Sequence, residues 1–413
     1  MKPCWFLPEE SKDMIITIYR GQNQIGGSII EIASDTTKVI LDVGSELDEE
    51  IPTAPKIEGL FYGENAYNAV FISHYHGDHL GLCDQILPSI PIYIGKSAAD
   101  ITNTARRYLN KPEYNFAGFY ESGKVISIGD INITPYLCDH SAFDSYMFHI
   151  SCGGKTLLYS GDFRSNGRKS FDHLLHKLPC VDALIVEGTT LSRISTKTKT
   201  EIELENIAVK EISNIEAPVF TLQAATNIDR LVTIFKVARQ TNRTLMQDLY
   251  MAEISSAVGG SIPNPKTFSG IRVFITGGWN ERHELLEQNY SKAKIGRAGI
   301  AKQKFVMCVR PSMQYYLEKL SEEISFEGGI LFYSMWEGYK KKEDVDAFLH
   351  FMQDKGVRVV DLHTSGHADV QAIKALIDDV SPEYIIPVHT ENATWFEENT
   401  VQKVVRNERL ILT

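Results

Sequence analysis

The amino-acid sequence predicts a layered α/β fold, and three features of the chain support this prediction. Short apolar runs with the composition of buried strands recur, and each of them ends at or next to an ionisable residue. Strands and amphipathic helices then alternate from about residue 200 to about residue 355. After residue 356 the earlier pattern returns in VRVVDLH (357–363) and YIIPVH (384–389). The first runs are AVFISH (69–74), ITPYLCDH (133–140), LLYSGD (157–162) and ALIVEG (183–188).

Individual elements can be placed in order along the chain. Residues 14–43 contain ITIY, SIIEIA and KVILDV, which we expect to form two or three short strands separated by turns. A polar, turn-like stretch, TLSRISTKTKT, begins near residue 190 and precedes an amphipathic helix. VFTL (219–222) then predicts a strand, and Asn227 is expected to cap the next helix at its N-terminus. Gly356 is expected to end a helix at its C-terminus.

The length of the chain and these patterns predict its domain organisation. At 413 residues it is too long for one ordinary core, which favours two or three domains. We expect residues 1–190 to form the first part of one metal-binding domain and residues 356–413 to complete it. Residues 191–355 are expected to be an insertion between its two parts.

Composition and charge limit the class of protein. Apolar residues make up 43% of the chain and charged residues 23%, as in soluble globular proteins, and no run approaches the roughly 18 apolar residues of a membrane span. The N-terminus has an acidic cluster where a signal peptide needs an apolar stretch, so we expect a cytoplasmic protein. The six cysteines are scattered, which favours reduced thiols. A net charge of -11 argues against a protein that coats nucleic acid, but not against a nuclease with bound metals.

The strongest chemical signal is HYHGDH, which follows directly after a predicted buried strand. A tight loop with ligands at alternating and adjacent positions can direct two side chains to one metal and two to another. Imidazole and carboxylate ligands without thiolate suit zinc, manganese or iron in open catalytic sites. The alternative is a histidine-rich surface loop, which four candidate ligands within six residues disfavour. These candidates are His74, His76, Asp78 and His79.

Six further candidates lie in or at the end of apolar runs. In layered α/β folds one end of the strands forms the crevice in which ligands bind. Taken alone, an Asp after a strand is usually a turn residue, and a lone His is usually an ordinary core or surface group. Their shared location favours a single functional site. The six are Asp42, His140, Asp162, Glu187, His363 and His389.

These motifs, in this order, resemble those of a known family. LDVGS (41–45), HYHGDH (74–79), DH (139–140) and YSGDFR (159–164) are similar to the four leading motifs of the metallo-β-lactamase superfamily. EGT (187–189), HTSGHA (363–368) and IPVHTE (386–391) resemble the three further motifs of its β-CASP branch, which includes RNase J. The resemblance implies an αββα sandwich with an inserted β-CASP α/β domain. Thr390 stands where glycine is common in RNase J, and the chain ends soon after IPVHTE.

The resemblance also implies a metal site with defined ligands. Two divalent metal ions, zinc with manganese or iron as alternatives, would share Asp162 as a bridging ligand, and a hydroxide between them would attack the phosphate. Asp42 would orient a ligand or the bridging water. The first ligand group would be His74, His76 and His140. The second would be Asp78, His79 and His389.

Other motif residues are expected to act on the substrate. Asp78 belongs to the predicted catalytic set, and Glu187 with His367 is the predicted pair that protonates the leaving oxygen. The residues expected to hold phosphate oxygens, with a structural turn as the alternative, are His363, Ser365, Gly366 and His367.

These observations together predict a metal-dependent hydrolase that cleaves phosphodiester bonds of single-stranded RNA, as a monomer or homodimer and without a membrane. In the insertion, Arg230 could contact a phosphate and Trp336 or Tyr339 could stack a base, although packing is the more frequent role of such residues. One alternative is a hydrolase of the same fold acting on a lactone, a thioester, another small ester or a small phosphodiester. A DNA-directed nuclease and a silent nucleic-acid-binding scaffold are the others. The scaffold is disfavoured because every expected ligand is present.

Overall fold

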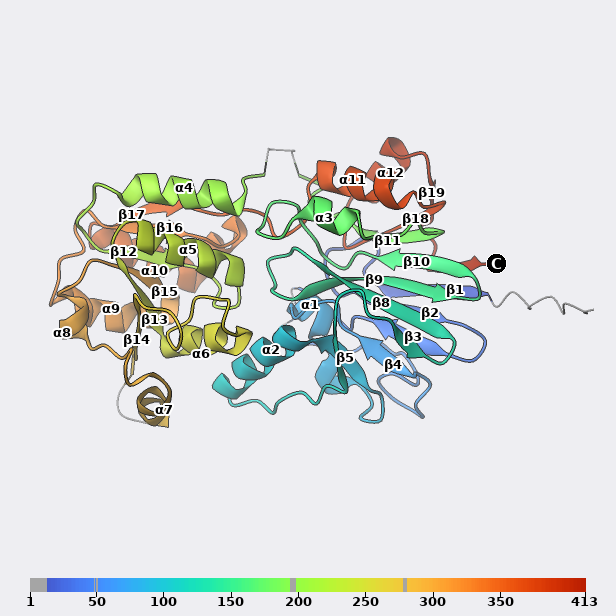
Figure 1. The fold of residues 1–413 in the computed structure, drawn as a ribbon, viewed down its shortest axis with the longest axis horizontal. Coiled ribbons are helices and arrows are strands. Elements are labelled where there is room, and N and C mark those ends of the chain that lie inside the picture. The colour runs from blue at the N-terminus through green and yellow to red at the C-terminus, as the bar shows by residue number, and fades with distance from the viewer. Residues whose placement is uncertain (1–12, 48, 50, 194–197, 278–280) are drawn as a thin grey trace, which may run out of the picture.

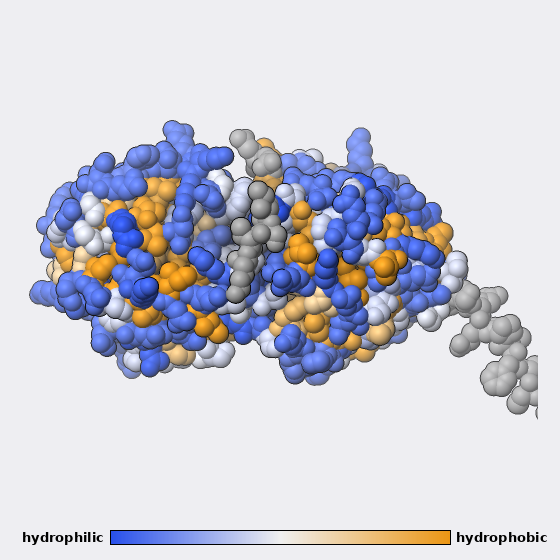
Figure 2. Space-filling view, turned by 90° about the horizontal axis from the view of Figure 1, so that it is seen from above, coloured by the Kyte–Doolittle hydropathy of each residue, from blue (hydrophilic) through white to orange (hydrophobic). Residues whose placement is uncertain are grey.

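The computed structural model describes residues 13–413, apart from residues 48, 50, 194–197 and 278–280. The expectation about a signal peptide concerns the N-terminal segment, most of which lies outside these residues, as does the middle of the polar stretch near residue 190. A two-sheet unit and a unit built on a third sheet follow one another along the long axis of the molecule (Figure 1). In the space-filling view they form two lobes separated by a constriction (Figure 2).

The first sheet combines the N-terminal strands with the last strand of the chain. The first three strands pair as an antiparallel ladder, and the next three continue the sheet in parallel. The C-terminal strand pairs antiparallel with the N-terminal one. In spatial order the strands are β20 (Arg409–Leu412), β1 (Met14–Arg20), β2 (Ile29–Ala33), β3 (Lys38–Leu41), β4 (Ala69–Phe71), β5 (Ile92–Gly95) and β6 (Gly118–Tyr120).

The second sheet is assembled from two distant parts of the chain. In spatial order the strands are β19 (Lys403–Val404), β18 (Tyr384–Val388), β11 (Ala183–Glu187), β10 (Lys155–Tyr159), β9 (Ser145–Cys152), β8 (Ile131–Cys138) and β7 (Ile126–Ile128). The four strands that come first in the chain, from β7 to β10, pair antiparallel. From β10 the sheet continues through β11, β18 and β19, which pair in parallel. The chain leaves this sheet after β11 and returns to it at β18, as an inserted domain requires.

These two sheets pack face to face around one apolar core. Along β1 the side chains of Met14, Ile16 and Ile18 are buried at alternate positions, and they join residues of the second sheet such as Phe148. Helices cover the two outer faces (Figure 1). This arrangement is the predicted αββα sandwich. Its helical segments are α1 (Gly77–Leu80), η1 (Cys83–Gln85), α2 (Lys96–Tyr108), α3 (Phe171–Leu175), α11 (Val370–Val380) and α12 (Thr394–Asn399).

The third sheet is entirely parallel, and apolar cores lie on both of its faces. In spatial order its strands are β14 (Ile271–Phe274), β13 (Thr244–Asp248), β15 (Phe305–Val309), β12 (Val219–Leu222), β16 (Ile330–Tyr333) and β17 (Arg358–Asp361). The helical segments around it are α4 (Glu201–Ile212), α5 (Ile228–Gln240), α6 (Leu249–Val258), α7 (Glu281–Tyr290), α8 (Arg297–Ile300), η2 (Pro311–Met313), α9 (Gln314–Ser321), η3 (Glu337–Lys341) and α10 (Glu343–Asp354).

Local signals in the sequence explain where these helices begin and end. A capping box of Thr200 and Glu203 starts α4, and the Asn227 side chain accepts a hydrogen bond from the Arg230 amide at the start of α5, as predicted. Gly356, with φ of +77°, directly follows the cap of α10 and provides the left-handed residue that commonly ends a helix.

One strand lies in a different sheet from the one that the sequence analysis assigned. The segment VRVVDLH was placed with the part of the chain that returns to the sandwich, but β17 pairs in parallel with β16 and completes the third sheet. An apolar run of this length suits either sheet equally, because composition does not specify the pairing partner. We therefore propose that the insertion extends to about residue 362. Among the described residues, none of the helices is both long and apolar enough to cross a membrane.

Candidate metal centre

The predicted site residues follow strands that run in parallel within each sheet of the sandwich. Asp42 follows β3 and His74 lies three residues beyond β4, which pairs in parallel with β3. In the second sheet, Asp162 follows β10, Glu187 ends β11 and His389 follows β18. Because parallel strands end at the same edge, these side chains are brought to one end of the sandwich.

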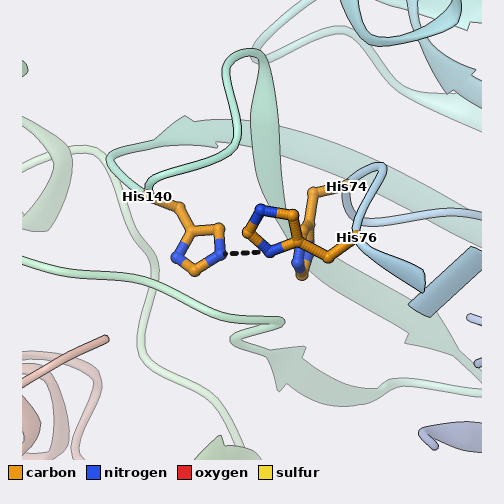
Figure 3. Close-up of side chains that lie close together, drawn as sticks. All are labelled: His74, His76 and His140. Atoms are coloured by element: carbon orange, nitrogen blue, oxygen red, sulfur yellow. Dashed lines mark hydrogen bonds between the residues drawn. The ribbon is translucent and has the colours of Figure 1, made fainter. Parts of the chain in front are cut away.

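A first group of histidines forms one part of the site. His74, His76 and His140 place one nitrogen each within 4.8 Å of one another (Figure 3). Two of these nitrogens, His140 Nε2 and His76 Nδ1, are only 3.1 Å apart. Burial lowers the pKa of His74 and His140 well below the ordinary value and lowers that of His76 to about 4. All three imidazoles are therefore neutral at pH 7, which is the form that ligates metals.

A second group lies beside the first and is joined to it by Asp162. Asp78, His79, Asp162 and His389 also offer ligand atoms within 4.8 Å of one another. Asp162 Oδ2 lies 3.3 Å from His79 Nε2 and 3.7 Å from His389 Nε2 in this group. The same oxygen lies 3.8 Å from His74 Nε2 and 3.9 Å from His140 Nε2 in the first group. Asp162 thus faces both groups at once.

Several atoms at the centre of this cluster lack hydrogen-bond partners. His74 Nε2, His79 Nε2 and both carboxylate oxygens of Asp162 are buried and make no hydrogen bond of acceptable geometry to any described residue. Leaving a buried polar atom unsatisfied costs about 1–3 kcal/mol, and buried polar groups in native proteins normally have a partner. Four such atoms facing one another fit a bound cation, and the donor set of imidazoles and carboxylates fits zinc.

The outer nitrogens of these histidines are held by protein groups. Nδ1 of His79 lies 2.8 Å from Asp42 Oδ2, and Nδ1 of His389 lies 2.7 Å from Thr189 Oγ1. Nδ1 of His140 is hydrogen-bonded to the Gly366 carbonyl oxygen. These contacts fix each ring so that Nε2 points to the shared centre, as partners beyond the ligands do in metal sites.

Asp42 is fully buried and organises the surrounding groups. Its carboxylate accepts hydrogen bonds from the Ser73 amide at 2.7 Å, from the Ser73 hydroxyl at 2.8 Å and from the Tyr159 hydroxyl at 2.6 Å. Asp42 and His389 both have φ above +50°, a region that non-glycine residues seldom occupy. Such backbone conformations cluster at functional sites, where surrounding contacts hold them in place.

Two glycines allow the Asp78 loop to approach the sandwich. A Cβ atom on Gly44 would lie 1.7 Å from the Asp78 carbonyl oxygen, and one on Gly26 would lie 2.9 Å from the Asp78 Cβ. Backbone atoms therefore pack where a larger residue would exclude them. Neither glycine was singled out as a site residue from the sequence, although Gly44 lies within the LDVGS motif.

Glu187 and His367 meet at the side of this cluster. His367 Nδ1 lies 3.1 Å from Glu187 Oε2, and Thr189 donates to the same oxygen at 2.7 Å. Burial would lower the pKa of His367, but the charges of Glu187 and Asp162 outweigh it and raise the pKa to about 9. Both residues also lie within 4.8 Å of Asp162 and His389, so the geometry alone permits them as ligands too.

The other predicted substrate residues differ in their surroundings. The Ser365 hydroxyl accepts a hydrogen bond from the His367 amide at 3.0 Å, so it shapes the turn. A Cβ on Gly366 would lie 2.5 Å from Ser141 Oγ, so glycine is needed there for close packing. His363 is exposed and belongs to none of the ligand groups found among the described residues. A phosphate-binding role for these residues stays a prediction.

The three residues singled out in the insertion differ in burial. Arg230 is 1% exposed and binds Glu201 and the Leu362 carbonyl oxygen, so it has the packing role weighed as its alternative. Trp336 and Tyr339 are 51% and 36% exposed, and they remain available to a ligand. Thr189 and Arg164 were missed as individual site residues, although they lie in the motifs EGT (187–189) and YSGDFR (159–164).

Comparison with known proteins agrees with this geometry. Residues 24–200 match the family described as "Metallo-beta-lactamase superfamily", and residues 354–402 match the "Zn-dependent metallo-hydrolase RNA specificity domain". The two matches contain all seven predicted metal ligands. The chain belongs to the metallo-β-lactamase superfamily. Within it, the chain falls in the β-CASP, RNase J-like branch and is a metal-dependent hydrolase.

Several relatives of this superfamily resemble the chain over most of its length at low identity. Ribonuclease J of Mycoplasma pneumoniae is 21% identical over 407 residues, which covers 91% of this chain and 68% of that protein. Ribonuclease J 1 of Streptococcus pyogenes is 22% identical, with 90% of this chain and 67% of that protein covered. An RNase J-like protein of Methanocaldococcus jannaschii is 24% identical over 52% of this chain and 53% of that protein.

A solved structure supports the same fold. A protein of unknown function from Enterococcus faecalis superimposes with a TM-score of 0.80 at 19% identity, covering 97% of this chain and all of that one. At this identity the likeness concerns the fold and not the activity.

Proposed function

We propose that the chain is a ribonuclease that hydrolyses phosphodiester bonds of single-stranded RNA with two bound divalent metal ions. The observation that carries the proposal is the position of Asp162, whose Oδ2 lies within 3.9 Å of ligand nitrogens from both groups. A shared carboxylate between two sets of imidazoles suits a pair of metals held close together. Sites of this kind are built for displacement reactions at phosphate.

Each metal would be held by a separate group of residues. We assign His74, His76 and His140 to one metal and Asp78, His79 and His389 to the other, with Asp162 between them and zinc as the expected ion. When bound, the metals would lower the pKa of a water molecule and neutralise charge on the phosphate. Asp42 would hold His79, and Thr189 would hold His389, in the orientation that ligation needs.

Glu187 and His367 are assigned to the leaving group. Glu187 Oε1 accepts a hydrogen bond from the Phe163 amide at 2.9 Å, while Oε2 holds Nδ1 of His367. His367 is thereby oriented by a carboxylate that is itself fixed. The His367 side chain keeps 23% of its surface exposed, so its remaining nitrogen can reach a substrate. A proton on that nitrogen would pass to the leaving oxygen as the P–O bond breaks.

The comparisons favour RNA as the substrate, and the arrangement of the two lobes favours a single strand over a duplex. The segment that matches an RNA specificity domain includes His367 and His389, and two of the relatives named above are called ribonucleases. The third sheet and its helices form a second lobe beside the metal end of the sandwich (Figure 1). A flexible strand can enter between two lobes more easily than a duplex, which is about 20 Å wide.

The proposal is tested by comparing kcat/KM on four substrates with and without a chelator. They are a 5′-labelled single-stranded RNA, the same RNA as a duplex, a DNA of matching sequence, and a chromogenic phosphodiester or lactone. We expect the single-stranded RNA to be cut fastest and the chelator to stop the reaction. Faster turnover of the small substrate, with RNA left uncut in zinc, manganese and iron, would replace the ribonuclease by a small-molecule hydrolase. Faster cleavage of the DNA would make it a DNA-directed nuclease.

A further inference from the structure

The insertion contains a cavity that the metal chemistry does not use. It has a volume of about 480 Å³, within the range of small-ligand sites, and it lies at the carboxyl ends of β12, β13, β15 and β16. In open parallel sheets with helices on both faces, ligands bind at this edge. The apolar part of its wall includes Leu222, Met251, Val309, Met313, Met335 and Val345.

One polar group in the wall of this cavity is unsatisfied. Gln223 is only 5% exposed, and its Nε2 has no hydrogen-bond partner among the described residues. The side chain follows β12 directly and lines the cavity. A buried amide donor without a partner costs about 1–3 kcal/mol, which a ligand with a hydrogen-bond acceptor would offset.

The charges and rings of the wall indicate the kind of ligand. Arg310 is paired with Asp248, and Lys342 and Asp344 add one charge of each sign, so the wall has no excess charge. This balance disfavours a phosphate and favours an uncharged group. Tyr250 and Tyr339 also line the cavity, and aromatic side chains of this kind stack on planar bases.

The cavity is connected to the metal centre through a short segment of the chain. Gln223, Ala224 and Ala225 line the cavity, and the next residue, Thr226, accepts a hydrogen bond from the Tyr75 hydroxyl at 2.7 Å. Tyr75 lies between His74 and His76. A second link runs from Tyr250 to Tyr108 of α2, with ring centroids 4.7 Å apart. The segment that lines the cavity is therefore in contact with the loop that carries two of the proposed metal ligands.

We propose that this cavity is a nucleobase subsite that receives one base of the RNA strand at a distance from the bond that is cut. The subsite rests on the proposed ribonuclease function. The base stacks on Tyr339, and one of its acceptor atoms binds the Gln223 amide. Trp336, which is half exposed and has its ring centroid 5.4 Å from that of Tyr339, extends the aromatic surface at the edge of the cavity.

The test combines variants of the protein with abasic nucleotides in the substrate. A set of labelled single-stranded RNAs carries one abasic residue at each position in turn, and kcat/KM is measured for the zinc-loaded full chain. For the wild type we expect one position, away from the cleaved bond, at which the abasic residue lowers kcat/KM about 5- to 150-fold, the range that base stacking supplies. Tyr339→Ala should lower kcat/KM on intact RNA by a similar factor and abolish the penalty at that position.

Two further variants distinguish the subsite from general damage. Gln223→Met keeps the length of the side chain without the amide, and it should reduce the penalty at the same position. Tyr315→Ala is the matched control, because Tyr315 is 70% exposed on α9 and lies outside the cavity, so the penalty should persist. An abasic scan without a sensitive position, or a penalty unchanged in Tyr339→Ala and Gln223→Met, would overturn the subsite. Wild-type protein that leaves intact RNA uncut would overturn the ribonuclease function, and the subsite with it.

Discussion

Two buried clusters of polar side chains contain residues that are close neighbours in the sequence. They differ in whether their polar atoms have hydrogen-bond partners. His140 and Asp162 belong to the proposed metal centre, whereas Asp139 and Arg164 belong to an ionic cluster between the sandwich and the insertion. In the first cluster four atoms lack a hydrogen-bond partner within the part of the chain that the structure describes. In the second, Arg164 Nε lies 3.2 Å from Asp139 Oδ1 and its NH2 lies 2.6 Å from Asp229 Oδ2. Buried charge without partners indicates a ligand site, and buried charge with partners indicates structure.

The ionic cluster joins the two units through helices α4 and α5 and three loops. Glu201 of α4 lies 3.1 Å from Arg230 and 3.8 Å from Arg164. Arg230 in turn binds the Leu362 carbonyl oxygen, just before the chain re-enters the sandwich. Two guanidinium groups and the carboxylates of Asp139, Asp229 and Glu201 satisfy one another at the point where the insertion leaves and returns. The cluster therefore fixes the insertion relative to the residues that flank two proposed metal ligands.

The largest effect is expected from removing a ligand of the metal centre. Asp78→Ala should lower the rate of RNA cleavage about 10³-fold or more, because a bound metal stabilises the transition state by several kcal/mol. The fold should persist, since the Asp78 carboxylate makes its contacts within the site, to His79 and His389. Activity assays on the metal-loaded variant, with circular dichroism as the control for folding, measure this. Retention of more than a few per cent of the activity would contradict the ligand set.

A second effect separates catalysis from metal binding within the same site. Glu187→Gln and His367→Ala should each lower kcat by about 10²–10⁴-fold while two metals remain bound, because both act on the leaving oxygen. Metal content and turnover are measured on the same preparation. Both residues are near enough to Asp162 and His389 to ligate. Loss of a metal in either variant would therefore make that residue a ligand and refute the assigned role.

The ionic cluster should respond in stability rather than in chemistry. Arg164→Met leaves Asp139 and Asp229 buried without their cation, and it should lower the free energy of unfolding by about 3–5 kcal/mol. The matched control is Arg107→Met, which breaks an exposed pair with Glu113 and should cost at most about 1 kcal/mol. Urea denaturation of both variants gives the comparison. Equal losses of unfolding free energy in the two variants would show that the ionic cluster does not stabilise the fold.

The smallest mutational effect is expected at Asp42, which holds a ligand without ligating. Asp42→Asn keeps the shape of the side chain and removes its charge, and it should weaken metal affinity about 10- to 100-fold. Competition with a metal-binding dye measures this change. An affinity equal to that of the wild type would remove Asp42 from the set of residues that tune the site.

The sequence predicted the local parts of this arrangement more fully than the parts made by distant contacts. HYHGDH was readable because its ligands lie within six residues and follow a strand, and the ends of parallel strands place Asp162 and His389 nearby. The Asn227 cap of α5 was equally local. These features depend on spacing and on backbone hydrogen bonds, both of which a single sequence encodes.

Other features depend on which segments meet across the fold. Arg230 lies 132 residues from Leu362, and no local pattern indicates that its guanidinium donates to that carbonyl oxygen. The pairing of β17 with β16 could not be told from a place in the sandwich, since the apolar run suits both sheets. The nucleobase cavity likewise forms from four strand ends and two distant tyrosines. Such contacts are set by the packing of whole layers.

We infer that the unpartnered atoms around Asp162 mark a centre for two metals. Elemental analysis of protein purified without chelator and loaded with zinc tests it most directly, with the Asp162→Asn variant measured in parallel. We expect about two equivalents of zinc per wild-type chain and a clear loss in the variant, because Asp162 faces both ligand groups. One equivalent or fewer in the wild type after loading, or a variant that retains both metals at unchanged affinity, would contradict the account.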